Sequence, residues 1–325
     1  MTQLSTDPVV LFEQAAAGSR VALARLLTMV ERGGATSEAV AALSYQGPIP
    51  YTVGLTGAPG AGKSTLTDQL ITTARGGWPA ARAQTAEPLD QVAVLAIDPS
   101  SPFTGGAILG DRVRMQGHAT DPTVFIRSMA TRGHLGGLSL AVPDAIRVLG
   151  TAKMPVVLVE TVGVGQMEVD VARATDTTVV VMNPGWGDSM QANKAGLLEI
   201  ADIFVINKAD RPGVKEARRD LEQMLDLSHL GDWRPPIVET VAAKGEGTEA
   251  FWATVADHRA YLIEANLLAE RRKGRLDDLL AQVVAAMVER RVGELRQSPD
   301  YEALMQAVTA GSIDPYGAAH QLLGD

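Results

Sequence analysis

The feature that most constrains the fold is a glycine-rich stretch at residues 57–64. It reads Gly-Ala-Pro-Gly-Ala-Gly-Lys-Ser, follows an apolar run at 53–56 and precedes a helical pattern of apolar residues. A strand, a G-x-x-x-x-G-K-S loop and a helix in this order are typical of a phosphate-binding loop. The glycines let the backbone curl so that successive N–H groups and the helix N-terminus face one anion. The sequence therefore predicts a nucleoside triphosphate site.

Two side chains of this loop have expected roles. Lys63 is expected to reach the β- and γ-phosphates, and the Ser64 hydroxyl is expected to bind Mg²⁺. A glycine-rich turn without a ligand is the alternative, and it fits the full motif with these flanks poorly. The predicted contacts to the nucleotide are Gly57, Ala58, Pro59, Gly60, Ala61, Gly62, Lys63, Ser64 and Thr65.

Composition excludes several classes of protein. The chain has 325 residues, of which 46% are hydrophobic and 21% charged, and this is ordinary for a globular protein with a sizeable core. A net charge of −9 and a pI near 5.1 argue against nucleic acid or an anionic membrane as a partner. The chain has no cysteine, which excludes disulfides, thiolate metal sites and a cysteine nucleophile. Without a leader pattern or a long apolar run, a cytoplasmic location is expected.

Apolar runs separated by helical patterns predict the fold. These runs lie at 53–56, 92–97, 124–126, 156–159, 178–182, 203–206 and 237–241. Because the runs are continuous rather than alternating, we expect strands buried on both faces in a mostly parallel sheet between helices. The predicted class is therefore α/β, a P-loop NTPase domain at 48–258. A helical extension at 1–47, which packs on this domain or on a partner, and a helical arm at 259–325 are expected to flank it.

Two acidic residues follow strands of the predicted sheet. Asp98 ends the run at 92–97 and Glu160 ends the run at 156–159. The carboxyl edge of a parallel sheet is where the phosphate loop also lies, so each acid is suited to hold Mg²⁺ or its bound water. A turn or helix-cap role is the alternative for Asp98. The amide of Gly163, three residues after Glu160, is expected to sense the γ-phosphate.

A second glycine-rich stretch at 103–114 is predicted to act as a switch. Asp111 is expected to contact the metal, and Arg114 to stabilise charge in the transition state. A surface loop without such a role is the alternative. Together with Lys63 and Glu160, these two residues make up the predicted catalytic set.

The stretch Asn207-Lys208-Ala209-Asp210 follows the run at 203–206 and predicts guanine as the base. The Asp210 carboxylate can accept both the ring N–H and the exocyclic amine of guanine, a donor pair that adenine lacks on that edge. Lys208 is expected to lie over the base plane, and Asn207 to tie this loop to the phosphate loop. A backbone amide within Val241, Ala242 and Ala243 is expected to meet the guanine oxygen. GTP and GDP are the predicted ligands, with Mg²⁺.

The order and wording of these motifs resemble the MeaB/ArgK-type GTPases, the methylmalonic aciduria type A protein family. The resemblance covers nearly the whole chain. The shared strings are GAPGAGKST (57–65), VLAIDPSSPFTGGAILGDRVRM (94–115), ETVGVGQ (160–166), NPGWGD (183–188), LLEIADIFVINKAD (197–210) and AAKGEG (242–247).

The resemblance implies a G domain, a homodimer through the C-terminal helices and a chaperone role. The client would be adenosylcobalamin-dependent methylmalonyl-CoA mutase, with cofactor loading, protection and reactivation as the task. The family's Mg²⁺-linked positions match Ser64, Asp98, Asp111 and Glu160. Two departures stand out, since Val241 replaces the family's usual serine and Trp186 occupies a position where a small residue also occurs.

The resemblance also changes the interpretation of Asp188, Gln191 and Lys194. Their three-residue spacing alone favours a solvated helix face. In the family these positions match a third switch loop that responds to the mutase, so we expect them to be partner-responsive.

The C-terminal arm carries an apolar stripe that includes Leu276, Leu280, Val283 and Met287. A stripe of this length needs a covering surface, either the main domain or a partner, and the resemblance favours a second copy. The basic run at 271–275 is expected to be a solvated face. Two other functions remain alternatives: a kinase-type ATPase of a lysine/arginine/ornithine transport system, and a metal-insertion GTPase. Zero cysteines and five scattered histidines argue against the second.

Overall fold

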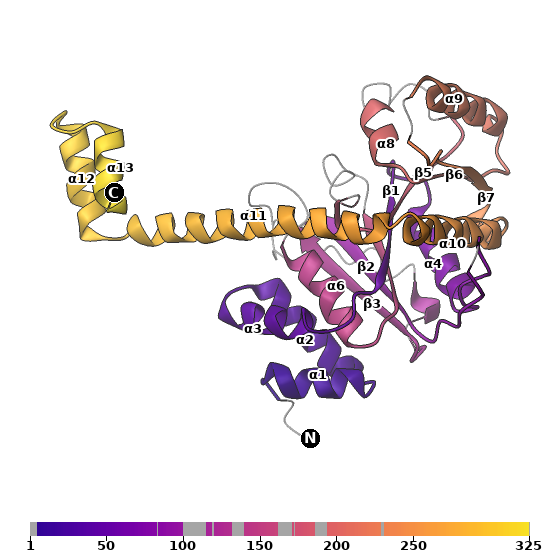
Figure 1. Cartoon of the computed structure of the whole chain (residues 1–325), viewed down its shortest axis with the longest axis horizontal. Helices are drawn as coiled ribbons and strands as arrows, with labels where there is room; N and C mark the ends of the chain where they lie inside the picture. The colour runs from indigo at the N-terminus through magenta and orange to yellow at the C-terminus, as the bar shows by residue number, and fades with distance from the viewer. Residues whose placement is uncertain are drawn as a thin grey trace. The chain divides into compact units, whose positions relative to one another are not determined.

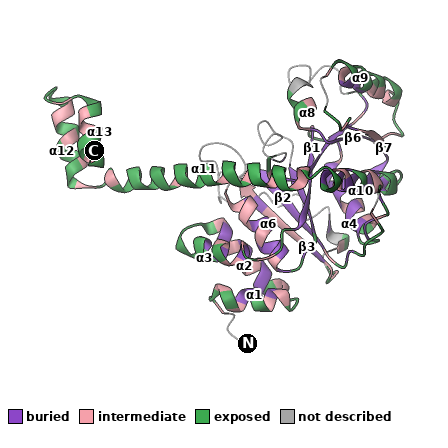
Figure 2. Cartoon of the chain, in the orientation of Figure 1, coloured by how far each residue is buried: buried purple, intermediate pink, exposed green. Residues whose placement is uncertain are grey.

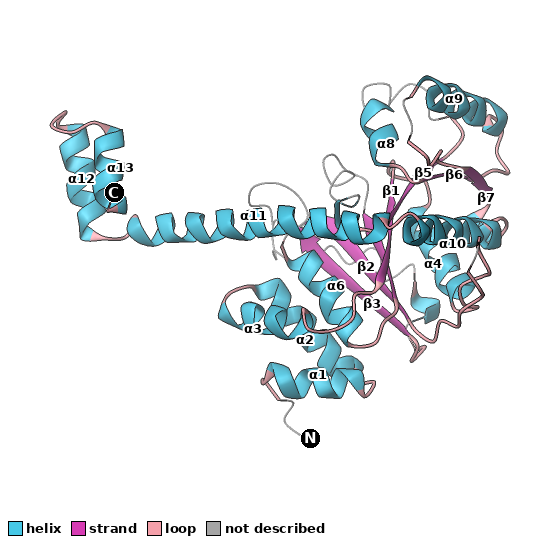
Figure 3. Cartoon of the chain, in the orientation of Figure 1, coloured by secondary structure: helices cyan, strands magenta, loops and turns pink. Residues whose placement is uncertain are grey.

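The structure is a computed structural model that describes residues 5–82, 84–99, 115–118, 120–131, 140–161, 171, 173–185, 194–228 and 231–324. The chain divides into two compact units, Met1–Arg272 and Lys273–Asp325. Figures 1 and 3 show the course of the chain and its helices and strands.

A parallel sheet runs through the first unit. Its strands are β1 (Tyr51–Thr56), β2 (Val92–Pro99), β3 (Val124–Thr131), β4 (Val156–Thr161), β5 (Thr177–Met182), β6 (Ile203–Asn207) and β7 (Ile237–Thr240). Among the described residues the sheet has seven strands in the order β3-β2-β4-β1-β5-β6-β7, and each neighbouring pair is parallel. The predicted fold class is confirmed. Because all strands run the same way, the loops that leave their carboxyl ends share one edge.

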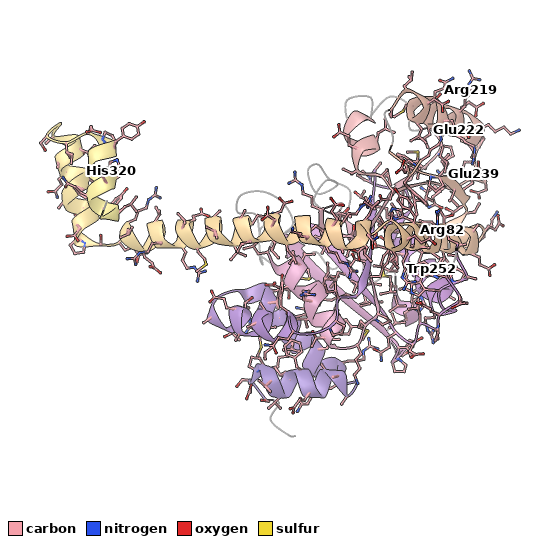
Figure 4. All side chains as sticks on the ribbon, in the orientation of Figure 1. Arg82, Arg219, Glu222, Glu239, Trp252 and His320 are labelled. Atoms are coloured by element: carbon pink, nitrogen blue, oxygen red, sulfur yellow. The ribbon has the colours of Figure 1, made fainter. Side chains whose placement is uncertain are left out.

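Two helices cover one face of the sheet, and one of them is the helix that follows the phosphate loop. They are α4 (Lys63–Ala74) and α10 (Thr248–Glu264), and they enclose one core with strand residues such as Leu55 and Leu158. Trp252 of α10, labelled in Figure 4, stacks on Trp78 with ring centroids 4.4 Å apart. Its indole N–H also donates to the carbonyl of Gly77 at 2.9 Å, so the Trp252 ring is held by both stacking and a hydrogen bond.

The opposite face is covered by the N-terminal helices and α6. These are α1 (Pro8–Ala16), α2 (Arg20–Arg32), α3 (Ala35–Ser44) and α6 (Ala141–Thr151). The carboxylate of Asp7 caps α1 by accepting from the Val9 amide at 2.9 Å, and Pro8 is the first residue of the helix. Side chains such as Leu26 pack in one buried cluster with Leu95 of the sheet. The N-terminal extension therefore packs on the sheet domain, and Figure 2 shows its buried inner face.

Further elements of the first unit are η1 (Gln116–His118), α8 (Lys194–Ile200), α9 (Val214–Leu227) and η2 (Ala242–Lys244). Leu221 and Leu225 of α9 pack against Phe204 of β6 in a third cluster. This packing fixes the strand that leads into Asn207.

The first turns of α11 (Leu267–Leu295) are tied to the amino edge of the sheet. Arg272 donates to Asp176 Oδ2 at 2.6 Å, and Arg271 donates to Asp202 Oδ1 at 3.0 Å. The two acids are almost fully buried and directly precede β5 and β6. The expectation that the basic run is only a solvated face is therefore wrong for these two arginines, because each has a buried carboxylate as its partner.

The second unit contains the rest of α11 together with α12 (Pro299–Thr309) and α13 (Pro315–Leu323). No described residue of α11 is buried. Its exposed apolar side chains are Leu276, Leu280, Val283, Val284, Met287, Val288 and Val292. None of the helices in the described part of the chain combines the length and the hydropathy that crossing a membrane requires.

Candidate functional site

The loop between β1 and α4 has a backbone that only glycine suits at two positions. Gly57 has φ 127°, and a Cβ there would lie 2.0 Å from the carbonyl oxygen of Val181 in β5. Gly62 has φ 93°, and a Cβ there would lie 2.3 Å from Nδ2 of Asn207. Both glycines therefore permit close approach as well as left-handed backbone. The loop brings its N–H groups and the amino end of α4 to the carboxyl edge of the sheet, where an anion is favoured.

Lys63 is the first residue of α4 and folds back into the loop. Its side chain is buried, and Nζ donates to the carbonyls of Gly57 at 2.7 Å and Ala58 at 3.0 Å. A buried ammonium requires such partners, because burial without them is costly. The positive charge is thus held at the place where the phosphate groups of a nucleotide would meet the loop.

A hydroxyl and two buried carboxylates lie on the α4 side of the sheet. The Ser64 hydroxyl donates to Glu160 Oε1 at 2.5 Å, and both residues are buried. Glu160 pairs in register with Leu55 of β1 and Ala96 of β2. Because side chains alternate along a strand, Asp98 projects from the same face as Ala96, and it is 2% exposed. A hydroxyl and two carboxylates on the α4 side of β2 and β4 are the hard oxygen donors that Mg²⁺ prefers.

Asn207 joins three segments of the site. Its Nδ2 donates to the carbonyl of Ala61 at 2.8 Å. Its Oδ1 accepts from the Ala242 amide at 3.0 Å and from the Thr240 hydroxyl at 3.2 Å. The tie that the sequence predicted between Asn207 and the phosphate loop is present. The structure adds the second tie, to the loop after β7.

Lys208 and Asp210 lie on the solvent side of this junction. Lys208 adopts φ 60° and its Nζ donates to the carbonyl of Gly60 at 2.6 Å. Asp210 is 45% exposed, and its Oδ2 lies 3.7 Å from Nζ of Lys244 on η2. The amide of Ala209 donates to the Thr240 carbonyl at 3.0 Å, which fixes the loop against β7. An accessible carboxylate thus lies beside Lys244 at the same edge as the phosphate loop.

Several predicted site residues lie outside the described residues. These are Asp111, Arg114, Gly163, Asp188 and Gln191. Lys194 is the first residue of α8. Sequence reasoning missed two contributors, the Thr240 hydroxyl that donates to Asn207 and the Lys244 ammonium beside Asp210. The lysine could have been noted from the Ala-Ala-Lys-Gly string, whereas nothing in the local sequence singles out the threonine.

The fold and the site together define a P-loop nucleotide-binding protein. The sheet is parallel, a glycine loop joins a central strand to a helix, and polar loops lie along the same edge. The family model described as methylmalonyl-CoA mutase-associated GTPase MeaB matches residues 23–297. The chain belongs to this family, and it is a GTP-hydrolysing enzyme that binds guanine nucleotide.

Individual relatives agree with this assignment. The chain is 47% identical over 321 residues to a putative GTPase of Pyrococcus abyssi, covering 96% of this chain and 95% of that one. It is 41% identical over 217 residues to the fused isobutyryl-CoA mutase of Cupriavidus metallidurans, covering 64% of this chain but 18% of that one. The crystal structure of a LAO/AO transport system kinase shares the fold, with a TM-score of 0.69 at 24% identity and 99% coverage of both chains.

Proposed function

We propose that the carboxyl edge of the sheet binds Mg²⁺–GTP and hydrolyses it through the residues that the sequence singles out. The observation that carries this proposal is the hydrogen-bonded junction of Asn207 with Ala61 and Ala242, which joins the phosphate loop to both base-reading loops. In this arrangement the amides of residues 57–65 and Lys63 hold the phosphates. Asp210 accepts from the guanine N1–H and 2-amino group, Lys208 flanks the base, and a backbone amide of residues 241–243 meets the keto oxygen.

The metal proposal rests on the donor set. Ser64, Asp98 and Glu160 supply oxygen ligands from one face of the sheet, and the short contact of Ser64 with Glu160 brings two of them together. Asp111 is the fourth proposed position. Mg²⁺ at these residues would neutralise charge on the β- and γ-phosphates. The charge of Lys63 acts on the same oxygens, and Glu160 is suited to hold metal-bound water.

The remaining site residues are proposed from their motifs. Arg114 stabilises charge that develops on the transferred phosphoryl group, and the Gly163 amide senses the γ-phosphate. Asp188, Gln191 and Lys194 respond to the partner protein. These assignments give the site separate parts for binding, chemistry and signalling.

The proposed biological role is that of a GTP-dependent chaperone for adenosylcobalamin-dependent methylmalonyl-CoA mutase. The family description names association with that mutase, and one relative is itself a fused acyl-CoA mutase. The match spans only 18% of the fused relative, so the mutase activity in its name is a property of that relative and is not assigned to this chain. The GTPase would act as a timer that admits, protects or restores the mutase cofactor, and it would do so as a homodimer through its C-terminal helices.

The exposed apolar stripe on α11 supports the homodimer. Beyond its first turns, α11 gains little from packing inside its own chain, because none of its described residues is buried, and an isolated helix is marginally stable in water. Leu280, Met287 and Val288 are each more than half exposed at 62%, 54% and 58%. A second copy of the same helix would offer a matching apolar surface.

Neither alternative function is supported by a specific observation. Likeness to the transport system kinase at 24% identity concerns the fold. A group of three His, Cys, Asp or Glu side chains suited to hold a metal cargo was not found among the described residues. The chaperone role therefore remains the proposal.

Two measurements test these proposals. Calorimetry should show that wild-type protein binds GDP far more tightly than ADP, and that Asp210→Asn removes most of this preference. Phosphate release from GTP should rise when adenosylcobalamin-dependent methylmalonyl-CoA mutase is added. Equal affinity for GDP and ADP would refute the guanine site, while a rate that the mutase leaves unchanged would refute the chaperone role.

A further inference from the structure

Lys244 lies beside the carboxylate that is proposed to read the guanine base. Its Nζ is 3.7 Å from Oδ2 of Asp210, and the two side chains are 56% and 45% exposed. An ion pair this exposed contributes little to the free energy of folding, because water solvates both charges well when the pair is not formed. Its position therefore needs another explanation than stability of the fold.

The backbone that carries Lys244 is held firmly against the base-reading loop. The Lys244 amide donates to the Val241 carbonyl at 2.8 Å, and the Val241 amide donates to the Glu246 carbonyl at 3.0 Å. At the start of the same turn, the Ala242 amide donates to Oδ1 of Asn207 at 3.0 Å. The ammonium of Lys244 is thus presented to Asp210 from a fixed backbone position.

The chemistry of guanine places its keto oxygen next to the atoms that Asp210 would bind. O6 is attached to the ring carbon beside N1, so the oxygen and the N1–H lie on one edge of the base. A lysine ammonium carries three donors and is able to serve a carboxylate and a keto oxygen together. We propose that Lys244 donates to O6 of guanine while it stays beside Asp210, and so acts as a second specificity residue for the base.

This inference rests on the proposed guanine site and deepens it. Adenine carries an amino group at the position of O6, and that group would face the ammonium donor to donor. Lys244 would therefore add attraction for guanine and repulsion for adenine, as selective sites commonly do. The backbone amide of residues 241–243 would share O6 with it, since a keto oxygen accepts two hydrogen bonds.

The test is a cycle between one side chain and one base atom. Affinities of wild-type and Lys244→Met protein are measured by calorimetry for GDP, for IDP, which keeps O6 but lacks the 2-amino group, and for 6-thio-GDP, in which sulfur replaces O6. Lys244→Met should weaken binding of GDP and of IDP by the same factor, about three- to tenfold. This is the effect of one hydrogen bond of ordinary net strength, because solvent screens the donor's charge at this exposed site. The affinity for 6-thio-GDP should change less than about twofold, because sulfur is a poor acceptor.

Lys215→Met is the matched control, because it removes one positive charge from an exposed position of α9. It should leave all three affinities unchanged. An equal loss for all three nucleotides in Lys244→Met would overturn the proposal, since the lysine would then act only through general charge. An equal gain in affinity for all three nucleotides would also overturn the proposal, because the lysine would then compete with the base for Asp210. Unchanged affinities would overturn it as well.

The outcome is distinguishable from failure of the guanine site itself. That site fails if Asp210→Asn keeps the full preference for GDP over ADP, whatever Lys244→Met does. If Asp210→Asn loses the preference while Lys244→Met treats GDP and 6-thio-GDP alike, only the role of Lys244 is refuted.

Discussion

Replacing Asn207 by alanine should separate the phosphate loop from the base-reading loops. The substitution removes one donated hydrogen bond, to Ala61 O, and two accepted ones, from Ala242 N and the Thr240 hydroxyl. Ala61 and Ala242 are buried, so their backbone groups lose a partner where water has little access. An unsatisfied buried group costs about 1–3 kcal/mol, so two of them lower the free energy of unfolding by about 2–6 kcal/mol.

The assay is urea unfolding of nucleotide-free protein, followed by calorimetry with GDP. Asn207→Ala should reduce both the unfolding midpoint and the GDP affinity. Asn207→Asp is the matched variant, because its carboxylate keeps both accepted bonds while its second oxygen, which cannot donate, meets the Ala61 carbonyl. It should cost about 1–3 kcal/mol. Surface substitutions usually change the free energy of unfolding by no more than about 0.5 kcal/mol. An Asn207→Ala protein whose free energy of unfolding lies within that range of wild type would refute the view that this side chain joins the loops.

Three further predictions follow from single contacts. Gly57→Ala should abolish nucleotide binding, since its Cβ would lie 2.0 Å from a backbone oxygen, whereas Gly60→Ala, with nothing within 4 Å, should retain part of it. Burial raises the pKa of Asp144 to about 6 although Tyr45 donates a hydrogen bond to it. The folded state thus holds the Asp144 proton more tightly than the unfolded state does, so the free energy of unfolding falls as pH rises from about 4 through 6. Asp144→Asn should therefore be more stable than wild type at pH 8, by about 1–3 kcal/mol, but not at pH 4. Arg272→Met should lower the free energy of unfolding by about 3–5 kcal/mol, because the buried Asp176 carboxylate loses its ion pair with Arg272.

Each of these predictions has a contradicting result. Equal nucleotide binding by Gly57→Ala and Gly60→Ala would show that close approach to Val181 is unimportant. Urea unfolding that gives the same Asp144→Asn effect at pH 4 and pH 8 would remove the titration of Asp144 as the cause. An Arg272→Met protein as stable as wild type would mean that Asp176 is solvated in place of the pair.

The sheet and the phosphate loop could be predicted because their signals are local. A buried strand such as β4 requires a continuous run of apolar residues, and the loop at 57–62 requires glycine at fixed positions. The positions of Asp98 and Glu160 at the ends of apolar runs predict only that both lie at the carboxyl edge. The register of β2 against β4 is needed to show that they share a face.

Contacts between distant segments could not be predicted in the same way. Arg271 and Arg272 have the local surroundings of a solvated basic run, and their carboxylate partners lie 69 and 96 residues away in sequence. Only the strand order reveals that Asp176 and Asp202 start neighbouring strands at the edge to which the helix returns. The pairing of Lys244 with Asp210 has the same origin, because β6 and β7 must first be placed side by side.

These distant contacts give three strands a fixed residue at each end. Arg272 donates to the carbonyl of Pro50, just before β1, and to Asp176, just before β5, while Arg271 donates to Asp202, just before β6. At their carboxyl ends, β1 leads into the phosphate loop and β6 into Asn207, and β5 contacts Gly57 through Val181. The start of α11 and the nucleotide loops therefore contact the same strands at opposite edges of the sheet.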